Sequence, residues 1–318
     1  MLGLAFLFVS SVIGAGFVTG AELVIFFGNS PLPPALIATL VGVTIFVFLS
    51  MLIYVDKKNF TPPRVVFVPL YFAFFVIMTA GLMTLAGVWV AILCLAMCVV
   101  IVMSGFEKIV GYNKYIIAFV LVVVLFVTLQ NGSPESHPPP QGVSTPRTLY
   151  NVVIYAGMNM MLFPVVRRAR KNHSTKKILG AAAISAATLG LLVFVLMNAT
   201  AGHSNLAMPI LGLADNFWVR SAIFLSMFTS QFIGLFNIEA GIGKKTKGNQ
   251  RALLLVLICA TAFVFSLGGF TQLMSVVYPA IGLFMVVFLS CAFAWCYFFS
   301  RTRQHQVPPL DQHAPPLS

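Results

Sequence analysis

Two glycines interrupt the first apolar stretch of the chain, in a segment that reads SSVIGAG from Ser10 to Gly16. Gly14 is thirteen residues from either end of the stretch 1–27, which places it near mid-depth if the stretch crosses a membrane. Glycines there favour a helix break, and a break exposes the carbonyls of residues 10–13 and the amides of residues 14–17. Exposed carbonyls bind cations, and amides at a helix N-terminus bind anions. The alternative is that the glycines only allow close helix packing.

A second glycine lies at a corresponding place later in the chain, where Tyr155, Gly157 and Asn159 occupy the apolar stretch 149–166. Glycine-interrupted spans at corresponding positions of two halves indicate a central binding site. A buried amide such as that of Asn159 needs partners, so it either contacts a bound solute or bonds a neighbouring helix.

Three hydroxyl residues, Ser226, Thr229 and Ser230, share one helical face because they stand at positions i, i+3 and i+4. Hydroxyls that face exposed carbonyls could form an all-oxygen site for a monovalent cation. The alternative is that each hydroxyl bonds the carbonyl four residues earlier in its own helix.

Acidic residues are scarce, with seven Asp and Glu in 318 residues. Glu22 stands within an apolar stretch, where it could relay protons, contact a cationic group or bond a neighbouring helix. Glu239 lies near Lys244 and Lys245, which predicts an ion pair at the membrane surface. The chain shows no catalytic triad, metalloprotease motif or phosphate loop, and its five cysteines lie in apolar runs without metal-type spacing, so we predict neither an enzyme nor a cofactor.

The elements that must hold these residues are membrane-spanning helices. Charged residues form 8% of the chain, against about 25% in soluble domains, and hydrophobic residues form 59%. Such composition predicts an all-α integral membrane protein. The apolar runs give ten spans: 1–27, 34–55, 65–85, 87–104, 115–129, 149–166, 178–199, 218–240, 252–269 and 274–300.

Charge predicts the orientation of the spans. With the N-terminus in the cytoplasm, only Arg147 and Arg220 of the 19 Lys and Arg residues fall outside, so 17 lie in cytoplasmic loops or the tail. Both termini are therefore expected in the cytoplasm of a cell-membrane protein. The basic residues of these loops account for the net charge of +12. The charge therefore does not indicate nucleic-acid binding, and we expect no nucleic-acid partner. The basic cluster at 167–177 either contacts anionic membrane lipid or only sets the topology.

Four segments follow from this pattern. Residues 1–130 and 149–300 each hold five spans, residues 131–148 form a Pro/Ser/Gly-rich external linker, and residues 301–318 form a disordered cytoplasmic tail. Because five is odd, the two consecutive halves must have opposite orientation, which is typical of inverted-repeat transporters.

The string VIGAGFVTGAE, from Val12 to Glu22, resembles the opening span of the YkvI-type membrane protein family. Weaker likenesses continue at Ala80-Gly81, at Tyr115, through 155–161 and through 227–239. Ala21 departs from the family pattern, in which a polar amide precedes the glutamate. The family looks like a member of the amino acid–polyamine–organocation (APC) superfamily, whose LeuT-type fold has a five-plus-five inverted repeat with broken first and sixth helices.

The resemblance also implies two binding sites. One is a Na+ site formed by the carbonyls of Ser10, Ile13 and Ser226 and the hydroxyls of Thr229 and Ser230. The other is a solute site beside Gly14, Ala15, Gly16, Tyr155, Gly157 and Asn159. Glu22 would be a proton-coupling residue if protons replace sodium.

Together these features predict a secondary transporter that works by alternating access, coupled to sodium or to protons. Its partners would be membrane lipid and a small solute, a zwitterion such as an amino acid or an organic anion. The alternative is a non-transporting sensor or membrane-complex subunit with the same fold. The sequence makes no prediction of the oligomeric state.

Overall fold

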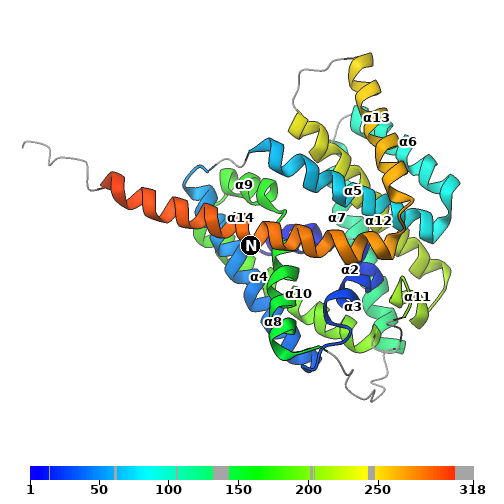
Figure 1. Ribbon diagram of the computed structural model, residues 1–318, viewed down its shortest axis with the longest axis horizontal. Coiled ribbons are helices and arrows are strands. Elements are labelled where there is room, and N and C mark those ends of the chain that lie inside the picture. The colour runs from blue at the N-terminus through cyan, green and yellow to red at the C-terminus, as the bar shows by residue number, and fades with distance from the viewer. Residues whose placement is uncertain are drawn as a thin grey trace, which may run out of the picture.

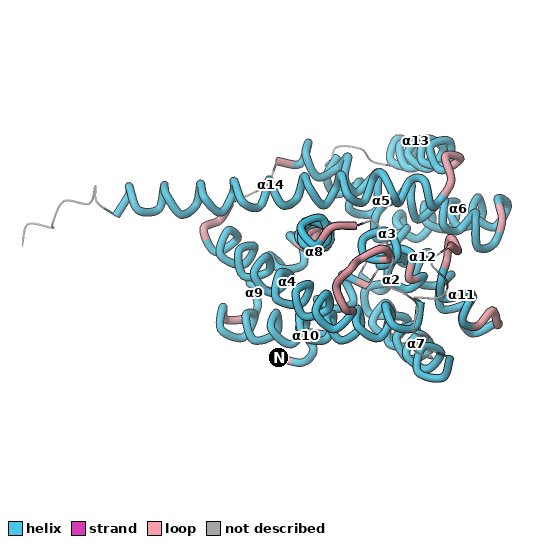
Figure 2. Tube along the Cα trace, turned by 60° about the horizontal axis from the view of Figure 1, so that its bottom comes forward, coloured by secondary structure: helices cyan, strands magenta, loops and turns pink. Residues whose placement is uncertain are grey.

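The computed structural model describes residues 1–13, 15–60, 63–104, 107–131, 143–200, 203, 205–242 and 248–304. Within these ranges the chain consists of helices and connecting turns, and it contains no strand, as Figure 2 shows. The helices form one bundle, across which the C-terminal helix α14 (Phe270–Gln304) lies before extending beyond it (Figure 1).

Eight of the ten predicted spans correspond to one helix each. They are α4 (Pro34–Lys57), α5 (Arg64–Ala86), α6 (Val88–Ser104), α7 (Glu107–Asn131), α10 (Thr175–Thr200), α12 (Phe217–Ile242), α13 (Asn249–Ser266) and α14. Six helices are long and apolar enough to cross a membrane: α4, α5, α10, α12, α13 and α14. Helix α6 and the 118–130 part of α7 are shorter apolar helices. An all-helical membrane protein is therefore confirmed, whereas a total of ten crossings stays a prediction.

The two remaining spans are each divided into shorter helices. In the sixth span the interruption follows Met158, so the break predicted at Gly157 falls within the preceding helix. In the first span a further interruption at Gly20, whose φ is 75°, was not predicted. The first span is divided into α1 (Leu2–Val12), α2 (Ala15–Thr19) and α3 (Ala21–Phe27). The sixth is divided into α8 (Thr145–Met158) and α9 (Phe163–Asn172).

Some helix ends differ from the predicted boundaries. Helix α8 begins at Thr145, because Pro146 at its start fits the first turn of a helix, so residues 145–148 of the predicted linker are helical. Helix α14 continues to Gln304, four residues into the predicted tail. The rest of the tail and linker residues 132–142 lie outside the described residues. The turn between α5 and α6 is a single residue, Gly87, whose φ of 89° favours glycine.

The most extensive helix contacts join α4 to α10 and α5 to α12. Small residues allow α4 and α10 to approach closely. A Cβ atom on Gly42 would lie 3.1 Å from the carbonyl oxygen of Ala186, and a Cβ atom on Gly190 would lie 3.0 Å from that of Ala38. Backbones this close favour van der Waals attraction between helices in a membrane.

Ion pairs join the helix ends that are predicted to be cytoplasmic. Arg170 pairs with the buried carboxylate of Asp56 at the end of α4. Arg251 pairs with Glu239 and donates to the carbonyl of Val102 over 3.0 Å, which ties α13 to α12 and α6. The ion pair predicted for Glu239 is therefore present, but its partner is Arg251, and the lysines at 244 and 245 lie outside the described residues.

One ion pair lies at an end predicted to be external. Arg220 donates two hydrogen bonds to Asp215, of 2.5 and 2.7 Å, and both side chains are about half exposed. These hydrogen bonds lower the pKa of Asp215 below its usual value, because they favour the ionised carboxylate.

Candidate functional site

The interruption between α8 and α9 leaves backbone groups outside the helical pattern. Helix α8 ends at Met158, and α9 begins at Phe163, where Pro164 at the start of the helix needs no amide hydrogen. In the turn, the amide of Met160 donates to the carbonyl of Gly157 over 2.9 Å. The carbonyl of Met161 accepts a 3.3 Å hydrogen bond from the hydroxyl of Tyr71, on α5. The neighbouring helix therefore stabilises the turn.

The interruption after α1 has a different geometry. Ile13 leaves the helix with φ −72° and ψ 86°, although its amide still donates to the carbonyl of Val9 over 2.9 Å. The chain resumes as a helix at Ala15. Gly14 itself, and the side chains of Ser10 and Ala15, are not among the parts of the chain that the structure describes, so their predicted roles stay untested.

Both interruptions open on one cavity of about 150 Å³. Its walls come from six helices, α3, α5, α8, α9, α12 and α14, together with the end of α1 and the turn between α8 and α9. The lining residues are Val12, Ile13, Glu22, Tyr71, Phe74, Met158, Asn159, Met161, Leu162, Val165, Ser230, Ile233, Gly234, Asn237 and Ile281. Helix breaks that face a shared cavity are typical of solute sites in membrane transporters.

Glu22 reaches the cavity from α3 and is 2% exposed. Its Oε2 atom has no hydrogen-bond partner among the described residues. The carboxyl lies against Gly16, because a Cβ atom there would overlap it. Gly16 therefore provides room for Glu22 and is not among the residues that line this cavity. The solute site that the family resemblance implies beside Gly16 stays a prediction.

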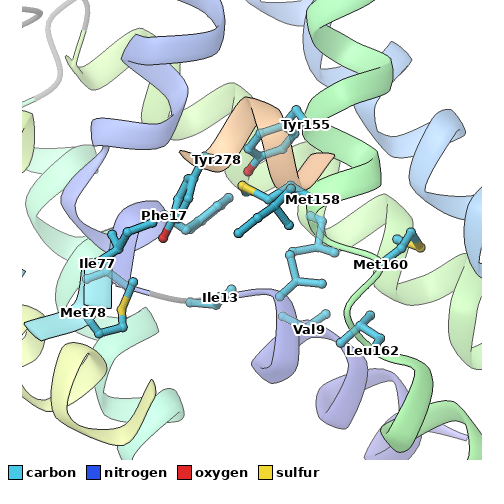
Figure 3. Packing of buried hydrophobic residues seen from close by; sticks show 14 of the residues in the cluster. Val9, Ile13, Phe17, Ile77, Met78, Tyr155, Met158, Met160, Leu162 and Tyr278 are labelled. Carbon is cyan, nitrogen blue, oxygen red and sulfur yellow. The ribbon is translucent and has the colours of Figure 1, made fainter. Parts of the chain in front are cut away.

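Asn159 also lines the cavity, and its Nδ2 donates to the carbonyl of Tyr155 over 2.8 Å. Tyr155 itself lies outside the lining, where its ring packs edge-on against Phe26 and Phe27 with centroids 5.4 Å apart. Figure 3 shows Tyr155 and Tyr278 among the buried side chains above Ile13. Both tyrosine hydroxyls lack a hydrogen-bond partner within the described part of the chain.

Gly157 serves helix packing. A Cβ atom at this position would lie 2.6 Å from the carbonyl oxygen of Gly282, so the glycine allows α8 to contact α14. This is the packing role that glycines commonly have in membrane helices. Gly157 is not among the residues that line the cavity.

The three hydroxyl residues predicted to share a cation site, Ser226, Thr229 and Ser230, lie in three different environments. Ser230 lines the cavity together with Ile13. Thr229 donates to two carbonyls of its own helix, Leu225 over 2.8 Å and Ser226 over 3.0 Å, which is the alternative that its sequence position left open. The hydroxyl of Ser226 is buried and has no partner among the described residues. The structure therefore brings Ile13 and Ser230 to one cavity and leaves Thr229 bonded within α12.

Tyr71, Phe74 and Asn237 line the cavity without having been predicted. Asn237 carried the same signal as Asn159, an amide within a long apolar helix, and could have been found by it. Tyr71 and Phe74 gave no comparable signal, because aromatic residues are common in membrane helices. The residues described contain no cluster of three or more His, Cys, Asp or Glu side chains able to hold a metal ion.

No protein-family model matches the chain, and no curated protein matches it. The resemblance to the YkvI-type family therefore stays a hypothesis. What the fold and the site define is a class, a multi-pass helical membrane protein with a small internal cavity at two helix interruptions.

Proposed function

We propose that this protein is a secondary active transporter of a small organic solute, working by alternating access and coupled to Na+, with protons as the second candidate for the coupling ion. One observation carries the proposal: the interruptions of the first and sixth spans contribute to the same cavity. Freed backbone groups are tolerated at membrane depth where they line a cavity or are buried in protein. In transporters, such groups bind the solute and its coupling ion.

A five-plus-five inverted repeat of the LeuT type, as in the APC superfamily, is part of the proposal. Its support is the reciprocal contact between α4 and α10, where Gly42 faces Ala186 and Gly190 faces Ala38. In a two-fold symmetric contact, if residue i of one unit meets residue j of the other, then j also meets i. Ala38 and Gly42 precede Ala186 and Gly190 by the same interval, 148 residues. This reciprocity is expected when two repeats are related by a two-fold axis in the membrane plane.

Sodium coupling rests on oxygen ligands near the first interruption. Ile13 and Ser230 share the cavity, and Thr229 neighbours Ser230 on α12. A threonine hydroxyl that donates to a carbonyl still has lone pairs that can face a cation. We place the ion between the end of α1 and this part of α12, with Ser10 and Ser226 as further ligands.

The first test is the melting temperature of detergent-purified protein in Na+ against equal K+ or choline. A ligand that binds only the folded state stabilises it by about 2.7 kcal/mol at a hundredfold excess over its dissociation constant. We expect a Na+-specific rise in the wild type and none in Thr229→Ala/Ser230→Ala. The matched control is Thr261→Ala/Ser275→Ala, which removes two exposed hydroxyls bonded to their own helices and should keep the rise.

Transport itself is tested with the purified chain in liposomes, using radiolabelled alanine and glycine as probes. We expect accumulation driven by an inward Na+ gradient, or by an inward proton gradient if sodium has no effect on melting. Lack of flux under either gradient, in liposomes where the protein is folded, would contradict transport of these solutes and favour a sensor or complex subunit.

A further inference from the structure

We propose that helix α9, together with the ends of α4 and α10 that are predicted to be cytoplasmic, forms a binding surface for the phosphate headgroup of an acidic phospholipid. The surface consists of six exposed cations, which we call the basic patch: Lys57, Lys58, Arg167, Lys171, Lys176 and Lys177. Basic residues at such a place either bind anionic lipid or only set the topology, and the arrangement of these six favours lipid binding. The proposal does not depend on the transport function.

The basic patch is assembled where three helices meet. Helix α9 contacts both α4 and α10, and Figure 2 shows it beside them. Arg170 of α9 pairs with Asp56 at the end of α4 and also donates to Oδ1 of Asn59 over 3.1 Å. Each member of this ion pair is followed in the chain by an exposed lysine, Lys57 after the aspartate and Lys171 after the arginine. The ion pair therefore brings cations of α4 and α9 together on one surface.

Among the side chains that the structure describes, no exposed carboxylate offsets the basic patch. The side chain of Asp56 is 1% exposed, and its charge is neutralised by Arg170. Glu239, the other acidic side chain described at a cytoplasmic end, pairs with Arg251. The exposed carboxylate of Asp215 lies at an end predicted to be external. The positive charge of the basic patch is therefore left for a partner outside the described chain.

The depth of the basic patch favours a lipid over a soluble anion. The cations stand at the ends of α4 and α10, which are both long and apolar enough to cross a membrane. In α9, Val166 and Ala169 are buried, whereas Arg167 and Lys171, one turn apart, are exposed. Clusters of about four to eight Lys and Arg next to a membrane span are typical of anionic lipid recognition, because the cytoplasmic leaflet has a negative surface potential.

A phosphate group suits the chemistry of the basic patch. A guanidinium such as that of Arg167 can donate two parallel hydrogen bonds to phosphate oxygens, and the lysines add charge and further N–H donors. Helix α9 follows directly on the turn that lines the cavity. A headgroup bound here therefore stabilises the cytoplasmic half of the interrupted sixth span in its folded position.

The melting temperature of the delipidated wild-type protein in detergent tests the proposal. The additives are phosphatidylglycerol, phosphatidylcholine with the same acyl chains, and glycerol 3-phosphate, which carries the charge without acyl chains. We expect phosphatidylglycerol alone to raise the melting temperature, and the rise to disappear at about 1 M NaCl, where the screening length is about 3 Å. An equal rise with phosphatidylcholine, or one that persists at high salt, would overturn recognition by charge. An equal rise with glycerol 3-phosphate would overturn the choice of a lipid.

The variant that assigns this effect to the basic patch replaces four of its cations by glutamine: Arg167→Gln, Lys171→Gln, Lys176→Gln and Lys177→Gln. We expect the phosphatidylglycerol concentration needed for half of the rise to increase at least about tenfold, because each Lys or Arg near an anionic surface adds to the attraction. Arg147→Gln/Arg220→Gln removes two exposed cations at ends predicted to be external, and it should keep the wild-type response. A folded fourfold variant that responds like the wild type would contradict the proposal. The salt test uses the wild type and therefore decides even if this variant does not fold.

Discussion

At the scale of single residues, the site depends on how each buried polar group is satisfied. Thr229 and Asn159 donate to carbonyls of their own helices. Tyr71 donates to the carbonyl of Met161 in the turn of the broken helix. Glu22 presents an oxygen that lacks a partner among the described residues. The satisfied groups hold the walls of the cavity in place.

Tyr71→Phe removes the 3.3 Å hydrogen bond to Met161 while keeping the ring. Hydrogen bonds between membrane helices contribute about 0.6 kcal/mol on average and up to about 1.7 kcal/mol. We expect the substitution to lower the free energy of unfolding, measured by denaturant titration, by about 0.6–1.7 kcal/mol. We also expect solute affinity to fall, because the turn of the interrupted helix loses its hydrogen bond to α5. Tyr150→Phe, at an exposed position of α8, is the control. Equal effects of the two substitutions would show that the hydrogen bond is unimportant.

At the scale of helices, glycines have two separable roles in this protein. Gly42 and Gly190 allow α4 and α10 to approach, and Gly157 does the same for α8 and α14. Gly87 instead provides a positive φ that ends one helix and starts the next. In this protein, a glycine within a membrane span is therefore not by itself a sign of a helix break, because several such glycines allow helices to pack closely.

Gly190→Val tests the crossing of α4 and α10. Its Cβ atom would lie 3.0 Å from the carbonyl oxygen of Ala38, and its methyl groups would force the helices apart. We expect a loss of about 1–3 kcal/mol in the free energy of unfolding, as for other overpacked cores, seen as a lower melting temperature. Ala187→Val, on an exposed face of the same helix, is the control. A Gly190→Val protein as stable as this control would contradict the close approach.

At the scale of the whole molecule, the ends of helices far apart in sequence meet in groups that fit the predicted orientation. Asp56 pairs with Arg170, and Glu239 pairs with Arg251 beside the end of α6. On the opposite side, Ser30 and Thr148 hydrogen-bond over 3.2 Å, although 118 residues separate them. Each of these contacts joins helix ends that the distribution of Lys and Arg residues predicts to lie on the same side of the membrane.

Accessibility of introduced cysteines tests this topology. Asn29 and Lys57 are exposed at opposite ends of the segment containing α4, which at 1.5 Å per residue is long enough to cross a hydrocarbon core of about 30 Å. We expect a membrane-impermeant maleimide to label Asn29→Cys in intact cells and Lys57→Cys only after permeabilisation. The unmodified chain is the control for labelling of its own cysteines, of which Cys291 is exposed and the other four are buried. Labelling of both variants from the same side would contradict a crossing by α4.

The sequence by itself determined the helices of this protein and that its first and sixth spans are interrupted. Long apolar runs need internal backbone hydrogen bonds in lipid, so they become helices wherever they occur, and a glycine lowers the cost of interrupting such a helix nearby. These are properties of neighbouring residues, which is why a pattern along the chain was sufficient for them.

Only the tertiary structure decided which residues line the cavity. Ile13 and Ser230, which only the family resemblance had put together, both line it, and so do the unpredicted Tyr71 and Asn237, whereas Gly157 and Tyr155 serve packing. The physical reason is that a helix apolar on all sides carries no amphipathic pattern to reveal which face points inward. Rotation about the helix axis is then fixed by contacts between distant segments, such as the close approach of Gly42 and Gly190, rather than by local sequence.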